Sequence, residues 1–162
     1  MAAPPSSASP LFLRESEVRR GIELLYFGYS NLTRSVDQGL AAQGLGRAHH
    51  RVLYFVARQP DLTVSELLGL LAITKQSLGR VLGDLTERAL VDMRPGERDR
   101  RQRLLRLTPA GQALEAELFD TIRIRLSAAY ASAGQNAVGG IWAVLEGLIP
   151  EDDKARIAAL RD

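Results

Sequence analysis

The 162-residue sequence contains no cysteine, few aromatic residues and no long hydrophobic run. The lack of cysteine excludes disulfides, thiolate metal sites and thiol-based redox sensing. No apolar stretch approaches the roughly 20 residues that a membrane-spanning helix needs, and the N-terminus lacks a basic start followed by a long apolar core. We therefore expect a cytoplasmic protein without a membrane partner.

Aromatic residues make up only 6% of the chain, whereas 46% of all residues are apolar. A composition with little aromatic content and much Ala, Leu and Gly favours helices over a β-sandwich. At this length the chain has room for one domain of ordinary size with its own hydrophobic core. The expected fold class is therefore mainly α.

The net charge is only +2, but the charge is unevenly distributed. Residues 47–108 carry 12 basic and 7 acidic side chains, whereas the rest of the chain carries 9 and 12. A basic middle between acidic flanks is typical of a nucleic-acid-binding module on a solvated scaffold. Because 19 of the 21 basic residues are Arg, an uneven scatter of arginines is the alternative explanation.

A long N-terminal helix is predicted from Glu15 to Gln43, after a flexible tail at residues 1–14 that is rich in Ala, Pro and Ser. A helix of roughly 40 Å is longer than a compact domain of this size needs, so we expect part of its apolar stripe to contact another chain. Packing within its own subunit is the alternative. The stripe has a heptad-like spacing and consists of Val18, Ile22, Leu25, Tyr29, Leu32 and Val36.

The middle of the chain has the element order of a winged helix-turn-helix. A helix is predicted at Arg47–Arg58. The spacing of Thr63 and Glu66 is that of a capping box, which predicts the start of a short helix. Thr74 is placed to cap a further helix with one buried face. That face consists of Leu78, Val81, Leu82 and Leu85.

After Ala89 the hydrophobic period changes from 3.6 to 2, which predicts a strand. Pro95 and Gly96 supply turn residues, and Leu105 and Leu107 alternate with arginine in a return strand. The prediction is a two-stranded β wing with a basic tip. Its arginines are Arg94, Arg98, Arg100, Arg101, Arg103 and Arg106.

The exposed face of the helix after Thr74 is the candidate base-reading surface, because a helix fits the major groove and meets base edges there. Gln76 can pair with adenine, and Arg80 matches guanine O6 and N7. Gly79 and Gly83 lack side chains, which indicates either close approach of another backbone or simple tolerance. The candidate DNA-binding residues are Lys75, Gln76, Ser77, Arg80, Arg98, Asp99, Arg100 and Arg101.

The C-terminal third is predicted to be helical throughout. Thr108 and Pro109 are typical of the N-cap and first turn of a helix, which runs to about Ala133. The apolar stripe of this helix steps by four and consists of Leu114, Leu118, Ile122, Leu126 and Tyr130. Two further helices are expected at 137–149 and 151–160, separated by Pro150.

The stretch from Leu62 to Gly111 resembles the MarR family of bacterial winged helix-turn-helix transcriptional regulators. The resemblance implies long N- and C-terminal dimerisation helices at 15–45 and 109–162 around a DNA-binding domain at 46–108. Ala89 is a departure, since the family usually has Gly there. The matching residues are Leu62, Thr63, Glu66, Leu67, Thr74 to Ser77, Leu85, Leu90, Val91, Asp99, Arg101, Leu107, Thr108 and Gly111.

The resemblance also implies a function. It implies a homodimer that binds a pseudo-palindromic site in double-stranded DNA as a transcriptional regulator, more often a repressor than an activator. Arg101 would be the wing arginine that enters the minor groove, with Asp99 orienting it. No catalytic residue, metal or cofactor is implied.

Family members are often released from DNA by a small aromatic or anionic effector bound between the dimer helices and the winged domain. His49 and His50 are the only histidines in the sequence, and adjacent helical residues point about 100° apart, so one metal ion is poorly served by both. An effector contact, a haem or metal role, a pH response and ordinary packing remain open for them. The candidate effector-pocket residues are Tyr26, Tyr29, His50, Tyr54 and Trp142.

Two other classes of function compete with a regulator. A winged helix can also dock a partner protein without binding DNA, but the basic exposed face favours an anion over a mixed protein interface. An enzyme is disfavoured because the sequence offers no set of nucleophile, base and orienting residue. The prediction is a sequence-specific DNA-binding regulator.

Overall fold

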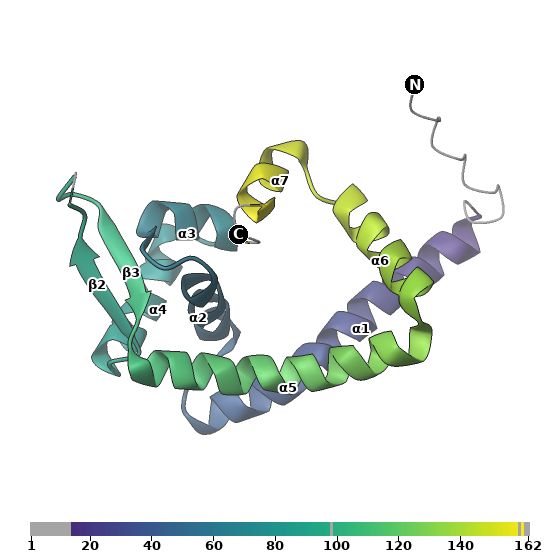
Figure 1. Cartoon of the computed structure of the whole chain (residues 1–162), viewed down its shortest axis with the longest axis horizontal. Coiled ribbons are helices and arrows are strands. Elements are labelled where there is room, and N and C mark those ends of the chain that lie inside the picture. The colour runs from purple at the N-terminus through teal and green to yellow at the C-terminus, as the bar shows by residue number, and fades with distance from the viewer. Residues whose placement is uncertain (1–13, 98, 159, 161–162) are drawn as a thin grey trace.

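The computed structural model describes residues 14–97, 99–158 and 160, and the helices and strands within them are shown in Figure 1. The predicted tail at 1–14 lies outside the described residues except for Arg14, which is the N-cap of the first helix. The helices are α1 (Glu15–Ala42), α2 (Arg47–Arg58), α3 (Val64–Leu71), α4 (Lys75–Glu87), α5 (Pro109–Ala133), α6 (Gln135–Gly147) and α7 (Glu151–Ala158). The strands are β1 (Leu62–Thr63), β2 (Val91–Pro95) and β3 (Arg103–Leu107). The predicted fold class, mainly α with a winged helix-turn-helix, is confirmed.

Three threonines begin the helices of the winged region as the sequence predicts. The Thr63 hydroxyl accepts a hydrogen bond from the Glu66 amide at 3.2 Å, and the Glu66 carboxylate accepts one from the Thr63 amide at 2.8 Å. Thr74 caps α4 and Thr108 caps α5 through the backbone amides of the third helical residues. These bonds satisfy donors that the first turn of a helix leaves free.

The sheet has one strand more than the two-stranded wing predicted from the sequence. Its order is β1-β3-β2 and both pairings are antiparallel. Leu62 of β1 faces Leu105 of β3, which in turn faces Met93 of β2. Because β1 contains only two residues, it is too short to show the alternating pattern from which strands are recognised.

The last two helices differ in their bounds from the prediction. α6 spans 135–147 instead of 137–149, and α7 ends at Ala158 instead of Leu160. Gly134 has a φ of +83° and lies directly between α5 and α6, so the new helix begins at once. Pro150 disfavours helical geometry at Ile149, and α6 ends at Gly147 with Leu148 as its C-cap.

The hydrophobic core lies within the winged half of the molecule, which comprises α2, α3, α4 and the three strands together with the end of α1 that packs on them. The side chains of Leu40 from α1, Leu53 from α2, Leu67 from α3, Leu85 from α4 and Leu105 from β3 are fully buried together. Burying a leucine side chain contributes about 1.5–3 kcal/mol each. The core therefore fixes the positions of α4 and the wing on a rigid base.

The junction of the wing with α5 requires a glycine. A Cβ atom on Gly111 would lie 2.0 Å from the carbonyl oxygen of Leu90, a distance that no real contact shows. Ala89, one residue before Leu90, has a left-handed φ of +54°. This conformation favours glycine, which explains physically why a glycine is expected at that position.

The long helices extend away from the core (Figure 1). α5 runs from the sheet along α1 and then contacts α6, which turns back over it. α7 returns to the winged half, where the Arg58 guanidinium donates a hydrogen bond to the Leu160 carbonyl. None of the helices in the described part of the chain is long and apolar enough to cross a membrane.

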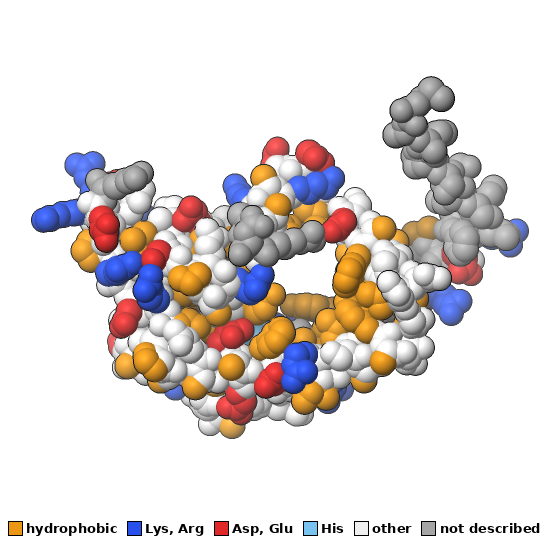
Figure 2. All heavy atoms as spheres, in the orientation of Figure 1, with side chains coloured by type: hydrophobic (Ala, Val, Ile, Leu, Met, Phe, Trp, Pro, Cys, Tyr) orange, Lys and Arg blue, Asp and Glu red, His pale blue; other side chains and the backbone are white. Residues whose placement is uncertain are grey.

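Large hydrophobic side chains are exposed on the long helices. In Figure 2 hydrophobic side chains gather around the central opening of the view, next to α6. Of the predicted heptad stripe, Val36 is buried and Leu32 half-buried, whereas the four residues nearer the N-terminus are exposed. The exposed residues on α1 are Val18, Ile22, Leu24, Leu25, Tyr26, Phe27 and Tyr29, and those on α6 are Ile141, Trp142, Val144 and Leu145.

Candidate nucleic-acid interface

Helix α4 presents the predicted base-reading residues to solvent. Lys75, Gln76, Ser77 and Arg80 are exposed, while the opposite face of the helix is buried in the core. The side chains of Lys75, Gln76 and Arg80 have no hydrogen-bond partner among the described residues, so their side-chain donors are available to a ligand. The Ser77 hydroxyl instead accepts a hydrogen bond from Thr74 at 2.8 Å and belongs to the helix cap.

A groove lies between α4 and the wing. Its volume is about 570 Å³, and its basic lining residues are Lys75, Arg101 and Arg103. Gly79 and Gly83 also line it, and a Cβ atom at either position would meet nothing within 4 Å. No internal contact with the described residues therefore requires these two glycines, and their effect is to widen the groove.

The wing tip is basic and ordered by Asp99. The Asp99 carboxylate accepts a hydrogen bond from the backbone amide of Arg101 at 2.9 Å, and the Asp99 carbonyl accepts one from the Gln102 amide at 3.0 Å. Asp99 thus orients the backbone of Arg101, and the side chains of Arg100 and Arg101 are exposed. Arg98 lies outside the described residues. Figure 2 shows Lys and Arg side chains projecting from this end of the molecule.

The base of the wing is held by Asp61, a residue whose role the sequence reasoning missed. Its carboxylate pairs with Arg94 of β2 at 2.7 Å and with Arg106 of β3 at 2.5 Å. The hydrogen bond from Arg106, supported by Arg94, lowers the pKa of Asp61 below its usual range. Two of the six wing arginines are therefore already paired with a carboxylate, which leaves the tip as the more strongly cationic part.

His49 also has a position that the sequence left open. Its Nδ1 accepts a hydrogen bond from the Gly46 amide at 3.0 Å, which caps α2. Its Nε2 lies 3.2 Å from the Asp84 carboxylate of α4. Asp84 is half-buried against this histidine.

The five predicted effector-pocket residues are spread over three helices. Tyr26 and Tyr29 are exposed on α1, Tyr54 is half-buried on α2, and Trp142 is exposed on α6, where its Nε1 donates to the Tyr130 hydroxyl at 3.1 Å. A cavity of about 470 Å³ includes Trp142 but none of the other four residues.

His50 is the buried member of this set, with 9% of its surface exposed. Its Nε2 has no hydrogen-bond partner among the described residues. Burial lowers the pKa of His50, and the nearby Asp37 carboxylate only partly opposes this shift. A buried polar atom of this kind is costly unless something pairs with it.

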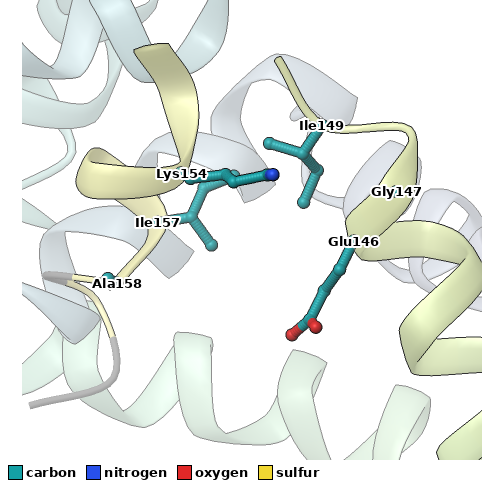
Figure 3. A pocket seen from close by; sticks show the side chains of 6 residues that line it. All are labelled: Glu146, Gly147, Ile149, Lys154, Ile157 and Ala158. Atoms are coloured by element: carbon teal, nitrogen blue, oxygen red, sulfur yellow. The ribbon is translucent and has the colours of Figure 1, made fainter. Parts of the chain in front are cut away.

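A separate cavity of about 390 Å³ lies between the end of α6 and α7 (Figure 3). Glu146 and Lys154 lie on opposite sides of it, and Ile149 and Ile157 supply apolar walls. The amine of Lys154 pairs with Glu151 at 2.6 Å. This cavity contains none of the residues predicted to bind an effector. Within the described part of the chain, no three His, Asp or Glu residues are grouped closely enough to hold a metal ion.

Comparison with known proteins agrees with the geometry. A model of the MarR family matches residues 43–102. The HTH-type transcriptional regulator PetP of Rhodobacter capsulatus is 42% identical over 158 residues, which cover 98% of this chain and 95% of that protein.

Two solved structures share the fold at low sequence identity. Streptococcus pneumoniae FabT in complex with DNA has a TM-score of 0.71 and 17% identity, over 81% of this chain and 94% of FabT. A mutant MarR from Escherichia coli complexed with operator DNA has a TM-score of 0.66 and 21% identity, over 88% of this chain and 100% of that one. The match to the family model and the 42% identity with PetP, together with the exposed face of α4 and the basic wing, establish that the chain belongs to the MarR family of transcriptional regulators.

Proposed function

We propose that the chain is a sequence-specific, homodimeric repressor that acts in the cytoplasm on a pseudo-palindromic operator. The observation that carries the proposal is the exposure of Lys75, Gln76 and Arg80 on one side of α4, beside a groove and a basic wing. Bound over a promoter, such a protein would exclude the transcription machinery.

The chemistry of the exposed residues matches the two grooves of DNA. The amide of Gln76 offers a donor and an acceptor for adenine N7 and N6, and the guanidinium of Arg80 can donate two hydrogen bonds to guanine. Lys75, in the first turn, suits a phosphate as a point charge. Arg101 at the wing tip suits the narrow minor groove, where the negative potential is strongest.

The exposed apolar stripe supports the homodimer. Val18, Ile22, Leu25 and Tyr29 recur at heptad-like spacing and are exposed in a single chain. Contiguous exposed apolar surface of this kind marks an interaction site. A second copy with the same stripe would place two α4 helices to face half-sites one helical turn apart, about 34 Å.

Binding to a selected operator tests this proposal. Duplexes are selected by the protein from a random library, and affinities for the selected and a scrambled duplex are then measured by fluorescence anisotropy at 50 and 200 mM salt. If the interface neutralises six to ten phosphates, affinity should fall about 10³- to 10⁵-fold between these salt concentrations. No selection of a common sequence, or affinity independent of salt, would instead favour a protein-docking module.

We also propose that a small aromatic or anionic effector releases the operator, with His50 as its buried polar contact. The support is the unpaired Nε2 of His50, which lies on α2 near Asp37 of α1 and has no partner among the described residues. Benzoate serves as a probe of this chemistry. It should weaken operator binding by the wild type more than by His50→Leu, and equal weakening of both proteins would reject the assignment.

A further inference from the structure

We propose that His49 is a positioning residue for DNA recognition. Its hydrogen bond to Asp84 restrains the rotation of helix α4 about its own axis. The inference rests on the proposed function, since it concerns how the base-reading residues are aimed. Both ring nitrogens of His49 have a hydrogen-bond partner.

The two hydrogen bonds of His49 define the tautomer of its neutral ring. Nδ1 accepts from the Gly46 amide, so it carries no proton, and the ring proton of the neutral form is on Nε2. Nε2 then donates to the Asp84 carboxylate at 3.2 Å. The side chain of His49 is 14% exposed, so both ring nitrogens are used in a largely enclosed position.

Asp84 lies where it can restrain the direction in which the base-reading side chains of Gln76 and Arg80 point. It follows Arg80 by four residues and Gln76 by eight, so all three lie along one slowly turning edge of α4. The N-terminal part of this edge is exposed, and the C-terminal part is anchored at Asp84. A bond at Asp84 therefore limits rotation of Arg80 and Gln76 about the helix axis.

The apolar core cannot supply this restraint as sharply. The core contacts of α4 are made by Leu78, Val81, Leu82 and Leu85, which are aliphatic side chains. The hydrophobic effect that drives this packing is non-directional, whereas a hydrogen bond to a carboxylate weakens steeply with angle. The core thus holds the buried face of α4 against the fold, and the hydrogen bond from His49 adds a directional restraint on the rotation of the helix.

A second bond ties the end of α4 to the same connection. Arg88, the C-cap of α4, donates to the Gln43 carbonyl at 2.7 Å. Gln43 and Gly46 both belong to the short link between α1 and α2, and Arg47 at its end pairs with Asp37 of α1 at 2.5 Å. The connection between α1 and α2 thus holds α4 directly through Gln43 at Arg88, and indirectly through Gly46 and His49 at Asp84.

The test is a double-mutant cycle read as a specificity ratio. The ratio of affinities for the selected operator and a scrambled duplex is measured for the wild type, His49→Ala, Asp84→Ala and the double variant. We expect each single change to lower the ratio about tenfold, and the double variant to lose little more, because both remove one bond. Using the ratio cancels the effect of the altered charge on non-specific binding.

Conservative variants separate positioning from simple stabilisation. The amide of Gln can accept from Gly46 and donate to Asp84, so His49→Gln should keep the ratio. Glu at this position keeps the cap but repels Asp84, so His49→Glu should lower the ratio without loss of the folded state. Additive losses in the cycle, or equal ratios for His49→Gln and His49→Glu, would overturn the proposal.

Amide hydrogen exchange of the free protein tests the same restraint without DNA. Exchange in residues 80–87 should accelerate in His49→Ala and Asp84→Ala relative to exchange in α3, and His49→Gln should match the wild type. A wild type that does not distinguish operator from scrambled DNA would reject the proposed function. Unchanged exchange in a protein that does distinguish them would reject only the role of His49.

Discussion

The winged half of the molecule and its helical half, which consists of the N-terminal part of α1, α5, α6 and α7, differ in how much of their apolar surface a single chain buries. In the winged half the helix caps, the sheet pairings and the leucine core are all supplied by the chain itself. In the helical half, α6 has no buried residue and the N-terminal part of α1 exposes large hydrophobic side chains. The winged half therefore buries its own apolar surface, whereas the other half leaves an apolar surface exposed that the proposed homodimer would cover.

The largest expected effect comes from placing a charge in the uncovered stripe. Leu25→Glu should separate the proposed dimer, because a carboxylate would have to be buried in its apolar interface. A monomer loses the benefit of two linked half-sites, so operator affinity should fall about 10²- to 10⁴-fold. Sedimentation and anisotropy measure the two effects.

The control for that change is Gln38→Glu, which adds the same charge at an exposed position of α1. It should leave both the mass and the operator affinity close to those of the wild type. A dimer that survives Leu25→Glu unchanged would mean that the exposed stripe of α1 is not the contact between chains.

The next effect sharpens the contrast in packing between the halves. Gly111→Ala should lower the free energy of unfolding by about 3 kcal/mol, because the added Cβ would overlap the Leu90 carbonyl at the base of the wing. Gly139→Ala on α6 should raise it by roughly 0.5–1 kcal/mol, since that position is open and helical. Urea unfolding measures both, and equal signs would show that the two halves are packed alike.

A smaller effect distinguishes residues of the winged half that recognise bases from residues that contact phosphates. Arg80→Ala should cost about 1–3 kcal/mol of operator binding and relax base preference at one half-site position, while affinity for random DNA changes much less. Arg20→Ala, which removes an exposed arginine from α1, serves as the control. Equal losses on specific and random duplexes would assign Arg80 to a phosphate instead of a base.

The smallest effect concerns His50, at the boundary between the halves. Burial lowers its pKa in the folded state, so below about pH 6.5 the unfolded chain binds more protons than the folded one. The free energy of unfolding should therefore fall as the pH drops from about 6.5, and His50→Leu should reduce this slope. Parallel pH profiles for the two proteins would show that His50 titrates freely.

The features that could be predicted from the sequence are those encoded within a few residues. The capping threonines Thr63, Thr74 and Thr108, and the alternation around Leu105 and Leu107, depend on neighbours within one or two turns. The winged helix-turn-helix could therefore be derived element by element. The exposed placement of the reading residues at 75, 76 and 80 followed from the same periodicity.

The features that could not be predicted depend on contacts between distant segments. Arg94 and Arg106 lie 33 and 45 residues after Asp61 in the sequence. They contact Asp61 only because β1 joins the edge of the sheet. His49 and Asp84 are likewise 35 residues apart. No local sequence pattern distinguishes such partners from ordinary solvated charges. The ion pairs of the wing and the hydrogen bond to α4 are therefore seen only in the folded chain.

The central claim, that one half of the chain is complete and the other is covered by a second copy, is tested most directly by sedimentation equilibrium of the wild-type protein, alone and with the selected operator. The account predicts twice the mass of a single chain in the free protein and two chains per operator duplex. A free protein with the mass of one chain, binding the operator as a single copy, would contradict it.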